Sequence, residues 1–240
     1  MSAFATGVRS RLLEFVREPT TAALLLVLPP VIVEVYGEAM ASFPALPGAT
    51  ADPGTTGRIV GALFAAAFLA GLVGLFQAVS ARGTDERLHH CGAGRASLLG
   101  ARVVTMATVA AAAAAVSLAA LARTVDVAAP VAAFGALALG AFVYGLFGVL
   151  VGALLPRQLE GSLVLVFLVD FDNVLASGVL DVGESVARVA PLYHPHALFE
   201  AAVTDGAVPV DHAFGGVAYA AVLLVLAFAA YVRAAGGEPT

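Results

Sequence analysis

The run Ile59–Val79, IVGALFAAAFLAGLVGLFQAV, contains no charged residue and no proline. A helix needs roughly 20 apolar residues to cross a hydrocarbon core about 30 Å thick, and this run has that length. Similar runs predict further spans near Thr20–Tyr36, Val103–Leu121, Val131–Leu155, Ser162–Leu180 and Ala213–Val232. The sequence therefore predicts an all-α integral membrane protein with six transmembrane helices.

The composition agrees with this class, because 60% of the 240 residues are hydrophobic and 12% are charged. Ordinary soluble domains are roughly 45–50% apolar and 25% charged. Only loops and short ends remain outside the predicted spans, so residues 1–240 are expected to form a single membrane domain. No basic stripe that would bind nucleic acid is present. Serine-nucleophile, Walker and zinc-protease motifs are also missing, so catalysis is not expected in this chain.

The first 18 residues have a helical pattern rather than the compact apolar region of a signal peptide. Their apolar residues fall on one stripe and their charged residues lie largely away from it; the stripe consists of Phe4, Val8, Leu12 and Phe15. This pattern predicts an amphipathic elbow helix that lies in the membrane interface. Pro19 is expected to end it and to turn the chain into the first span.

The arginine distribution predicts the orientation, since cytoplasmic loops carry an excess of basic residues. If both termini are cytoplasmic, nine arginines lie inside and three outside; the outer three are Arg58, Arg123 and Arg188. All 12 basic residues are arginine and alanine is abundant, which is typical of a GC-rich prokaryote. We therefore expect a multi-pass protein of a prokaryotic plasma membrane with both termini in the cytoplasm.

The last outer segment, residues 181–211, is long for a connection between two spans. It contains the apolar patches Val186–Pro191 and His196–Val203. We expect these patches to form short helices that dip into the outer leaflet.

The fifth predicted span is unusual because it contains Asp170, Asp172 and Asn173 in the sequence LVDFDNVL, Leu168–Leu175. Its leucine, valine and phenylalanine residues contribute about −4 to −7 kcal/mol to insertion, and two central aspartates cost about 2.5–3.5 kcal/mol each. The favourable and unfavourable contributions to the insertion free energy of this span therefore nearly cancel. The acids are therefore expected to face other helices, a wet cavity or a partner chain.

Helical geometry separates the two acids. Asp170, Asn173 and Ser177 are spaced at i, i+3 and i+7 and form one polar stripe, whereas Asp172 lies about 200° around the helix from Asp170. A functional interpretation places the stripe along a substrate or proton route. In a structural interpretation, the helix is broken near Asp170, and the acids cap backbone groups or lie at the outer water boundary.

The cysteine and histidine residues give little sign of a metal centre. Cys91 is the single cysteine, which excludes an intramolecular disulfide and a four-thiolate site. His194 and His196 flank a proline and His212 follows in the same region, but membrane metal sites usually need three or four convergent ligands. No metal site is predicted.

The segment between the second and third spans is TDERLHHCGAGRASLLGARV, Thr84–Val103. It resembles the cytoplasmic coupling segment of ABC-type exporter permeases, in which an acid–Arg pair leads through a short helix to a glycine and to the turn before the third span. The matching positions here are Glu86, Arg87, Gly92 or Gly94, and the stretch Ala96–Arg102. His89-His90-Cys91 replaces the aliphatic residues that follow the pair in that family.

The order of features along the rest of the chain is also similar to these permeases: an elbow helix, six spans, and a long outer segment with the proline-containing stretch APLYHP, Ala190–Pro195. The resemblance implies that a separate ATPase subunit binds ATP and Mg²⁺ and docks on Glu86, Arg87, Gly92, Gly94 and Arg95. It also implies a unit of two permease chains, identical or different, and two ATPases, with no cofactor in this chain.

Spans two and five line the dimer interface in that family. The resemblance therefore places Asp170, Asp172, Asn173 and Ser177 at the transport pathway or dimer interface of an exporter. The sequence does not identify its substrate, because lipids, hydrophobic drugs and peptides suit the spans equally. Two alternatives remain from the residues alone. One is a proton-coupled secondary transporter that uses Asp170 or Asp172, and the other is a haem- or metal-handling membrane protein that uses His194, His196 and His212.

Overall fold

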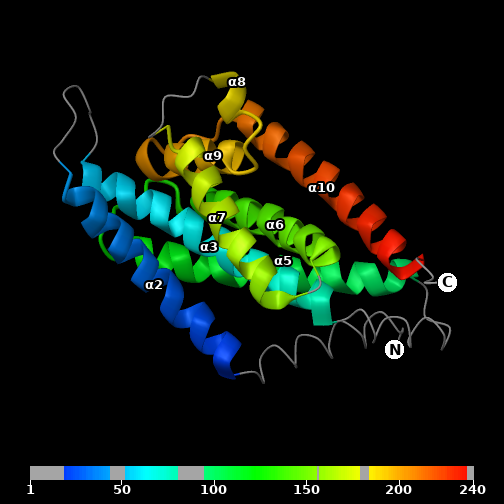
Figure 1. Cartoon of the computed structure of the whole chain (residues 1–240). Coiled ribbons are helices and arrows are strands. Elements are labelled where there is room, and N and C mark those ends of the chain that lie inside the picture. Colours follow the sequence, from blue (N-terminus) through cyan, green and yellow to red (C-terminus); the bar gives the residue numbers. More distant parts are fainter. Residues whose placement is uncertain (1–18, 44–51, 81–94, 156, 179–183, 237–240) are drawn as a thin grey trace.

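The computed structural model describes residues 19–43, 52–80, 95–155, 157–178 and 184–236, and every regular element in these ranges is a helix (Figure 1). The all-helical prediction is confirmed for this part of the chain. The helices are α2 Pro19–Ala41, α3 Pro53–Ser80, α5 Arg95–Leu121, α6 Pro130–Leu154, α7 Gln158–Ala176, α8 Glu184–Ala187, α9 Tyr193–Thr204 and α10 Val210–Gly236. The predicted elbow helix lies outside the described residues.

Five of these helices are long and apolar enough to cross a membrane: Ala23–Ala41 of α2, all of α3, Gly100–Leu121 of α5, all of α6, and Val210–Ala230 of α10. Their positions agree with five of the six predicted spans. The remaining predicted span corresponds to α7, which has 19 residues but includes Glu160, Asp170 and Asp172. Those acids set α7 apart from the other long helices.

Local sequence explains where several helices begin. Proline stands at the first position of α2, α3 and α6, where its missing N–H is not needed by the helix. Asp52 precedes α3, and its Oδ2 accepts hydrogen bonds from the backbone N and the hydroxyl of Thr55, at 2.9 and 3.0 Å. This cap satisfies one of the free N–H groups at the start of that helix.

Helix α3 forms the centre of the bundle and packs against α2, α5, α6, α7 and α9. Its closest approach is to α6, where Gly71 and Gly74 on α3 face Gly145 and Gly148 on α6. A Cβ atom on Gly74 or Gly148 would collide with a backbone carbonyl of the other helix, so these glycines allow direct backbone contact.

The two glycine pairs visible in the sequence both lie at helix contacts. Gly57 and Gly61 on α3 face Tyr36 of α2, and Gly152 follows Gly148 along α6, where it faces Leu75. Small side chains at these four positions let three helices pack closely. The spacing of four residues within each pair thus places both glycines on the face that packs against a neighbouring helix.

Helices α8 and α9 lie together at one end of the bundle, and α10 runs from that end along α6 and α9 (Figure 1). We call this the α9 end; α2 finishes there, and α3 and α6 begin there. The predicted helix over His196–Val203 is present as α9, whereas Val186–Pro191 is mostly turn after the short α8. Their expected position in the outer leaflet stays a prediction. Gly178 and Gly206, which flank this region, have positive φ angles of 70° and 68° and so make turns that other residues disfavour.

Candidate functional site

Helix α9 lies beside the first half of α6 rather than beyond its end. Side chains of Leu192 and Pro195 stand next to Gly140, which is about ten residues into α6. At the other end of α9, the backbone N–H groups of Ala128 and Ala129 donate to the carbonyls of Val203 and Ala202, at 3.1 and 2.9 Å. The start of α9 therefore lies about 15 Å along α6, inside the bundle.

Asp172 on α7 is buried against the start of α9, with 5% of its surface exposed. Its Oδ2 accepts a hydrogen bond from the Tyr144 hydroxyl at 2.5 Å and another from the backbone N of Leu192 at 3.0 Å. Leu192 is the residue that precedes α9, so the carboxylate lies at the positive end of the α9 helix dipole. Its other oxygen, Oδ1, has no hydrogen-bond partner among the described residues.

Asn173 is the second buried polar residue of α7. Its Nδ2 donates to the carbonyl oxygen of Val60 on α3 at 3.1 Å. At the far end of α7, Gln158 donates to the Ser80 hydroxyl at 3.1 Å. These two contacts show that α7 runs antiparallel to α3 over most of the length of both helices.

Asp170 points the other way and lies on the exposed surface of the bundle. Its Oδ1 accepts a hydrogen bond from the Tyr36 hydroxyl of α2 at 2.5 Å. The Tyr36 ring stacks on Phe64 of α3 with a centroid separation of 5.4 Å, so this contact joins three helices. The predicted angular separation of Asp170 and Asp172 is confirmed, and α7 is continuous through both acids.

The polar stripe predicted along α7 is divided between three environments. Asp170 is exposed, Asn173 is buried, and Ser177 follows the last residue of the helix, where its hydroxyl donates to the Val174 carbonyl at 2.9 Å. The buried carboxylate with a polar partner is thus Asp172 rather than Asp170. The transport role expected for these four residues stays a prediction.

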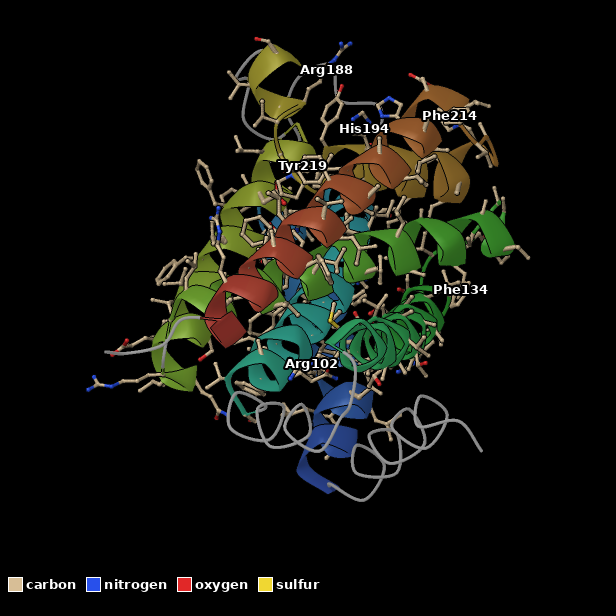
Figure 2. The ribbon with its side chains drawn as sticks, turned by 90° about the vertical axis from the view of Figure 1, so that its right-hand side faces the viewer. Arg102, Phe134, Arg188, His194, Phe214 and Tyr219 are labelled. Atoms are coloured by element: carbon tan, nitrogen blue, oxygen red, sulfur yellow. The ribbon has the colours of Figure 1, made fainter. Side chains whose placement is uncertain are left out.

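The predicted coupling residues Glu86, Arg87, Gly92 and Gly94 lie outside the described residues. Arg95 is the first residue of α5, and nothing is described of its side chain. Arg102, which ends the predicted coupling segment, is buried and donates from Nη1 to the carbonyl of Gln77 at 3.2 Å. It ties the start of α5 to the end of α3, at the end of the bundle opposite to His194 (Figure 2).

The three histidines within the described ranges, His194, His196 and His212, lie near the starts of α9 and α10. The Nδ1 atoms of His194 and His212 are 3.3 Å apart, and the Tyr193 ring lies near both imidazoles. His196 is buried, and burial lowers its pKa to about 4. Within the described ranges, no group of three or more histidine, cysteine, aspartate or glutamate residues is placed to hold a metal ion.

Two residues of this region were not identified from the sequence: Tyr36 and Tyr144, which donate to the two aspartates. A usable signal did exist, because a tyrosine hydroxyl buried in an apolar run needs a hydrogen-bond partner. Tyr144 is the one tyrosine in the predicted fourth span. The sequence does not indicate which acid each tyrosine contacts.

Comparison with protein-family models yields no match, and comparison with curated proteins yields none. The residues and their arrangement are therefore the basis for inferring what the protein does.

Proposed function

We propose that this chain is the transmembrane permease subunit of an ABC-type transporter, which moves a substrate outward with ATP hydrolysed by a separate subunit. The sequence order of elbow, spans, coupling segment and outer helical segment supports this proposal. Five apolar helices of spanning length support the membrane location. The proposed working unit contains two permease chains and two ATPases in a prokaryotic plasma membrane.

We propose that α7 also crosses the membrane, as the fifth of six spans in chain order, although its acids raise the free-energy cost of insertion. Each acid has a polar neighbour: Glu160 accepts from Arg157 at 2.9 Å, Asp170 from Tyr36, and Asp172 from Tyr144. Intramembrane acids become tolerable when they are paired in this way. Six crossings put both termini on one side, and the arginine distribution assigns that side to the cytoplasm.

The observation that carries the proposal is the exposed Tyr36–Asp170 pair. Its surroundings on α7 are large apolar side chains, with Phe167 73% exposed and Phe171 61% exposed. A carboxylate in the middle of a lipid-facing apolar surface costs about 2.5–3.5 kcal/mol. Cover by a second permease chain removes Asp170 from lipid and buries the two phenylalanines. We therefore assign the α2–α7 face to the interface between permeases. The resemblance implied spans two and five there, but α3, the second span, lies at the centre of the bundle and is mostly buried, so α2 takes its place beside α7 in this proposal.

Cysteine cross-linking in native membranes tests this interface. Cys91→Ser removes the single native cysteine, after which Phe167→Cys or Phe171→Cys is introduced on α7. We expect an oxidant to convert these variants into disulfide-linked dimers. The matched control is Phe214→Cys on α10, a phenylalanine that is 74% exposed on another face (Figure 2). Cross-linking at Phe214 without cross-linking on α7 would place the interface elsewhere.

The ATPase partner is tested by purification of the tagged chain from its native host in mild detergent. A stoichiometric Walker-loop ATPase should co-purify, and Glu86→Ala with Arg87→Ala should remove both the partner and the ATP hydrolysis. Arg123→Ala, a change between α5 and α6, should leave both intact. A chain that purifies alone from cells in which it functions would contradict the proposal.

The transport role of Asp170 is tested separately from assembly. Asp170→Ala is expected to impair transport while the dimer still forms. Loss of the dimer in this variant would make Asp170 a structural residue of the interface.

A proton-coupled transporter is the second candidate function, and Asp172 favours it. This carboxylate is buried, and its Oδ1 has no hydrogen-bond partner among the described residues. A carboxyl group in that setting is able to take up a proton without losing a contact at that oxygen. Transport driven by an imposed pH gradient in vesicles without any ATPase, and abolished by Asp172→Asn, would favour this candidate over the permease.

A further inference from the structure

His194 and His212 lie next to each other where α9 meets α10, with ring centroids 5.3 Å apart and an angle of 60° between the ring planes. His194 belongs to the first turn of α9 and His212 to the first turn of α10, and their Nδ1 atoms are 3.3 Å apart. Hydrogen bonds between nitrogen and an acceptor are usually 2.7–3.2 Å long. Two nitrogens bound at about 2.0–2.1 Å to one tetrahedral metal ion are separated by about 3.3 Å. The observed separation equals the one that a shared tetrahedral ion requires, and without an ion a proton on one of the two nitrogens bridges the same gap.

From this geometry we propose that His194 and His212 bind one divalent transition-metal ion, of the zinc, nickel or copper class, through their Nδ1 atoms. Imidazole nitrogen suits these ions, whereas magnesium and calcium prefer oxygen ligands. Water completes the coordination, since the part of the chain that the structure describes offers no third ligand of the usual types here. The bound ion links α9 to α10 at the α9 end of the bundle.

The other nitrogen of His212 supports this assignment. Its Nε2 lies 3.7 Å from Oδ2 of Asp211. Histidines that bind metals usually direct their second nitrogen to a carboxylate or carbonyl, which fixes the ring and makes the ligand more basic. In this proposal Asp211 becomes a positioning residue for the His212 ring once the two atoms close from 3.7 Å to hydrogen-bond distance.

Glycine at position 215 shapes the surroundings of the His194 ring. Gly215 of α10 leaves room for the ring, because a Cβ atom there would lie 2.6 Å from Nδ1 of His194. Figure 2 shows His194 beside the start of α10, with Arg188 nearby.

The test is zinc binding by the full chain, purified with a tag that contains no histidine. His89→Gln and His90→Gln form the background, because they remove the adjacent histidine pair elsewhere in the sequence. Equilibrium dialysis against Zn²⁺ should give one ion per chain. His194→Gln or His212→Gln should abolish this site, and Asp211→Asn should weaken it by about tenfold or more. Mg²⁺ at the same concentration should not compete.

Gly215→Ala provides a variant that keeps every proposed ligand but displaces the His194 ring, so it should weaken zinc binding. Gly135→Ala is its control, because a Cβ atom at Gly135 meets nothing within 4 Å. Copper paramagnetic resonance on the background chain needs no change at the site and should show two coupled imidazole nitrogens. The proposal is overturned if the background chain binds no zinc, if His194→Gln leaves binding unchanged, or if copper shows no pair of nitrogens. It stands apart from the proposed transport function, since it requires neither a second chain nor an ATPase.

Discussion

Tyr144 and Asp172 join consecutive helices through a 2.5 Å hydrogen bond in the interior of the bundle. Tyr144 is 1% exposed and Asp172 is 5% exposed. The same carboxylate oxygen also accepts from the backbone of Leu192, at the start of α9. One side chain therefore links α6, α7 and α9, and its loss should affect all three.

Tyr144→Phe should lower the free energy of unfolding by about 1–3 kcal/mol, because it leaves a buried carboxylate with one donor fewer. The shape of the ring is retained, so packing contributes little to the change. The measurement is the thermal unfolding midpoint of the purified chain in detergent. Tyr219→Phe is the control, since its hydroxyl donates to the Val189 carbonyl in an exposed position, at 3.2 Å. Equal shifts for the two variants would contradict a special role of the Asp172 contact.

Gly148→Ala should destabilise the chain by about 1–3 kcal/mol or prevent folding. The added Cβ atom would meet the backbone carbonyl of Gly71, which has no alternative rotamer to move to. Gly135→Ala, on the same helix, should be neutral or slightly stabilising, because alanine favours helix and this position is open. Yield of monodisperse protein on size-exclusion chromatography compares them. Equal yields of both variants would argue against direct backbone contact between α3 and α6.

His196 should make the folded state sensitive to acid. Burial lowers its pKa from 6.5 to about 4, so between these values the unfolded state binds more protons than the folded state. Stability is then full above about pH 6.5 and falls as the pH decreases toward 4, by up to about 1.4 kcal/mol per pH unit. Unfolding midpoints at pH 7 and pH 5 measure this loss.

The contribution of His196 is separated from that of its neighbour by substitution. Glu200 lies 3.7 Å from His196, and burial raises the pKa of Glu200, which acts in the opposite direction as the pH falls. Glu200 is present in both chains when wild type is compared with His196→Gln. The variant should lose less stability between pH 7 and pH 5. An equal loss would show that other groups cause the acid sensitivity.

The helices were predictable because each depends on a local run of apolar residues. Five of the six predicted spans match helices of spanning length, and the short outer helices were expected from two apolar patches. The separation of Asp170 from Asp172 also follows from local geometry alone, since 100° per residue puts them on different faces. What is local in the chain was predicted well.

The partners of the acids were not predictable, because they depend on packing between distant segments. Tyr36 and Asp170 are separated by 134 positions in the chain, and Leu192 approaches Asp172 because α9 folds back into the bundle. The spacing places Asp170 and Asn173 on one polar stripe, whereas in the structure Asp170 is exposed and Asn173 is buried beside Asp172. The same limit applies to the glycines, because their spacing shows which of them share a helix face but not which helix that face contacts.

Tyr36→Phe should affect association between chains more than folding, in contrast to Tyr144→Phe. Asp170 is exposed in the single chain, so loss of its hydrogen bond should change the thermal midpoint by little, within about 0.5 kcal/mol. At the proposed interface the same carboxylate becomes covered, and a covered carboxylate without its donor costs about 1–3 kcal/mol. This difference corresponds to a dimer dissociation constant that is roughly 5–150 times larger.

The two readouts separate these effects. Dimer dissociation is measured by dilution of fluorescently labelled chains in lipid vesicles, and folding by thermal unfolding of the monomer in detergent. Tyr36→Phe should shift the first and spare the second, while Tyr144→Phe should shift the second. A Tyr36→Phe chain that dimerises like wild type would show that the Tyr36–Asp170 pair lies outside the interface. A lower unfolding temperature of the Tyr36→Phe monomer would instead show that the Tyr36–Asp170 hydrogen bond stabilises the single chain, because no partner chain is present in that measurement.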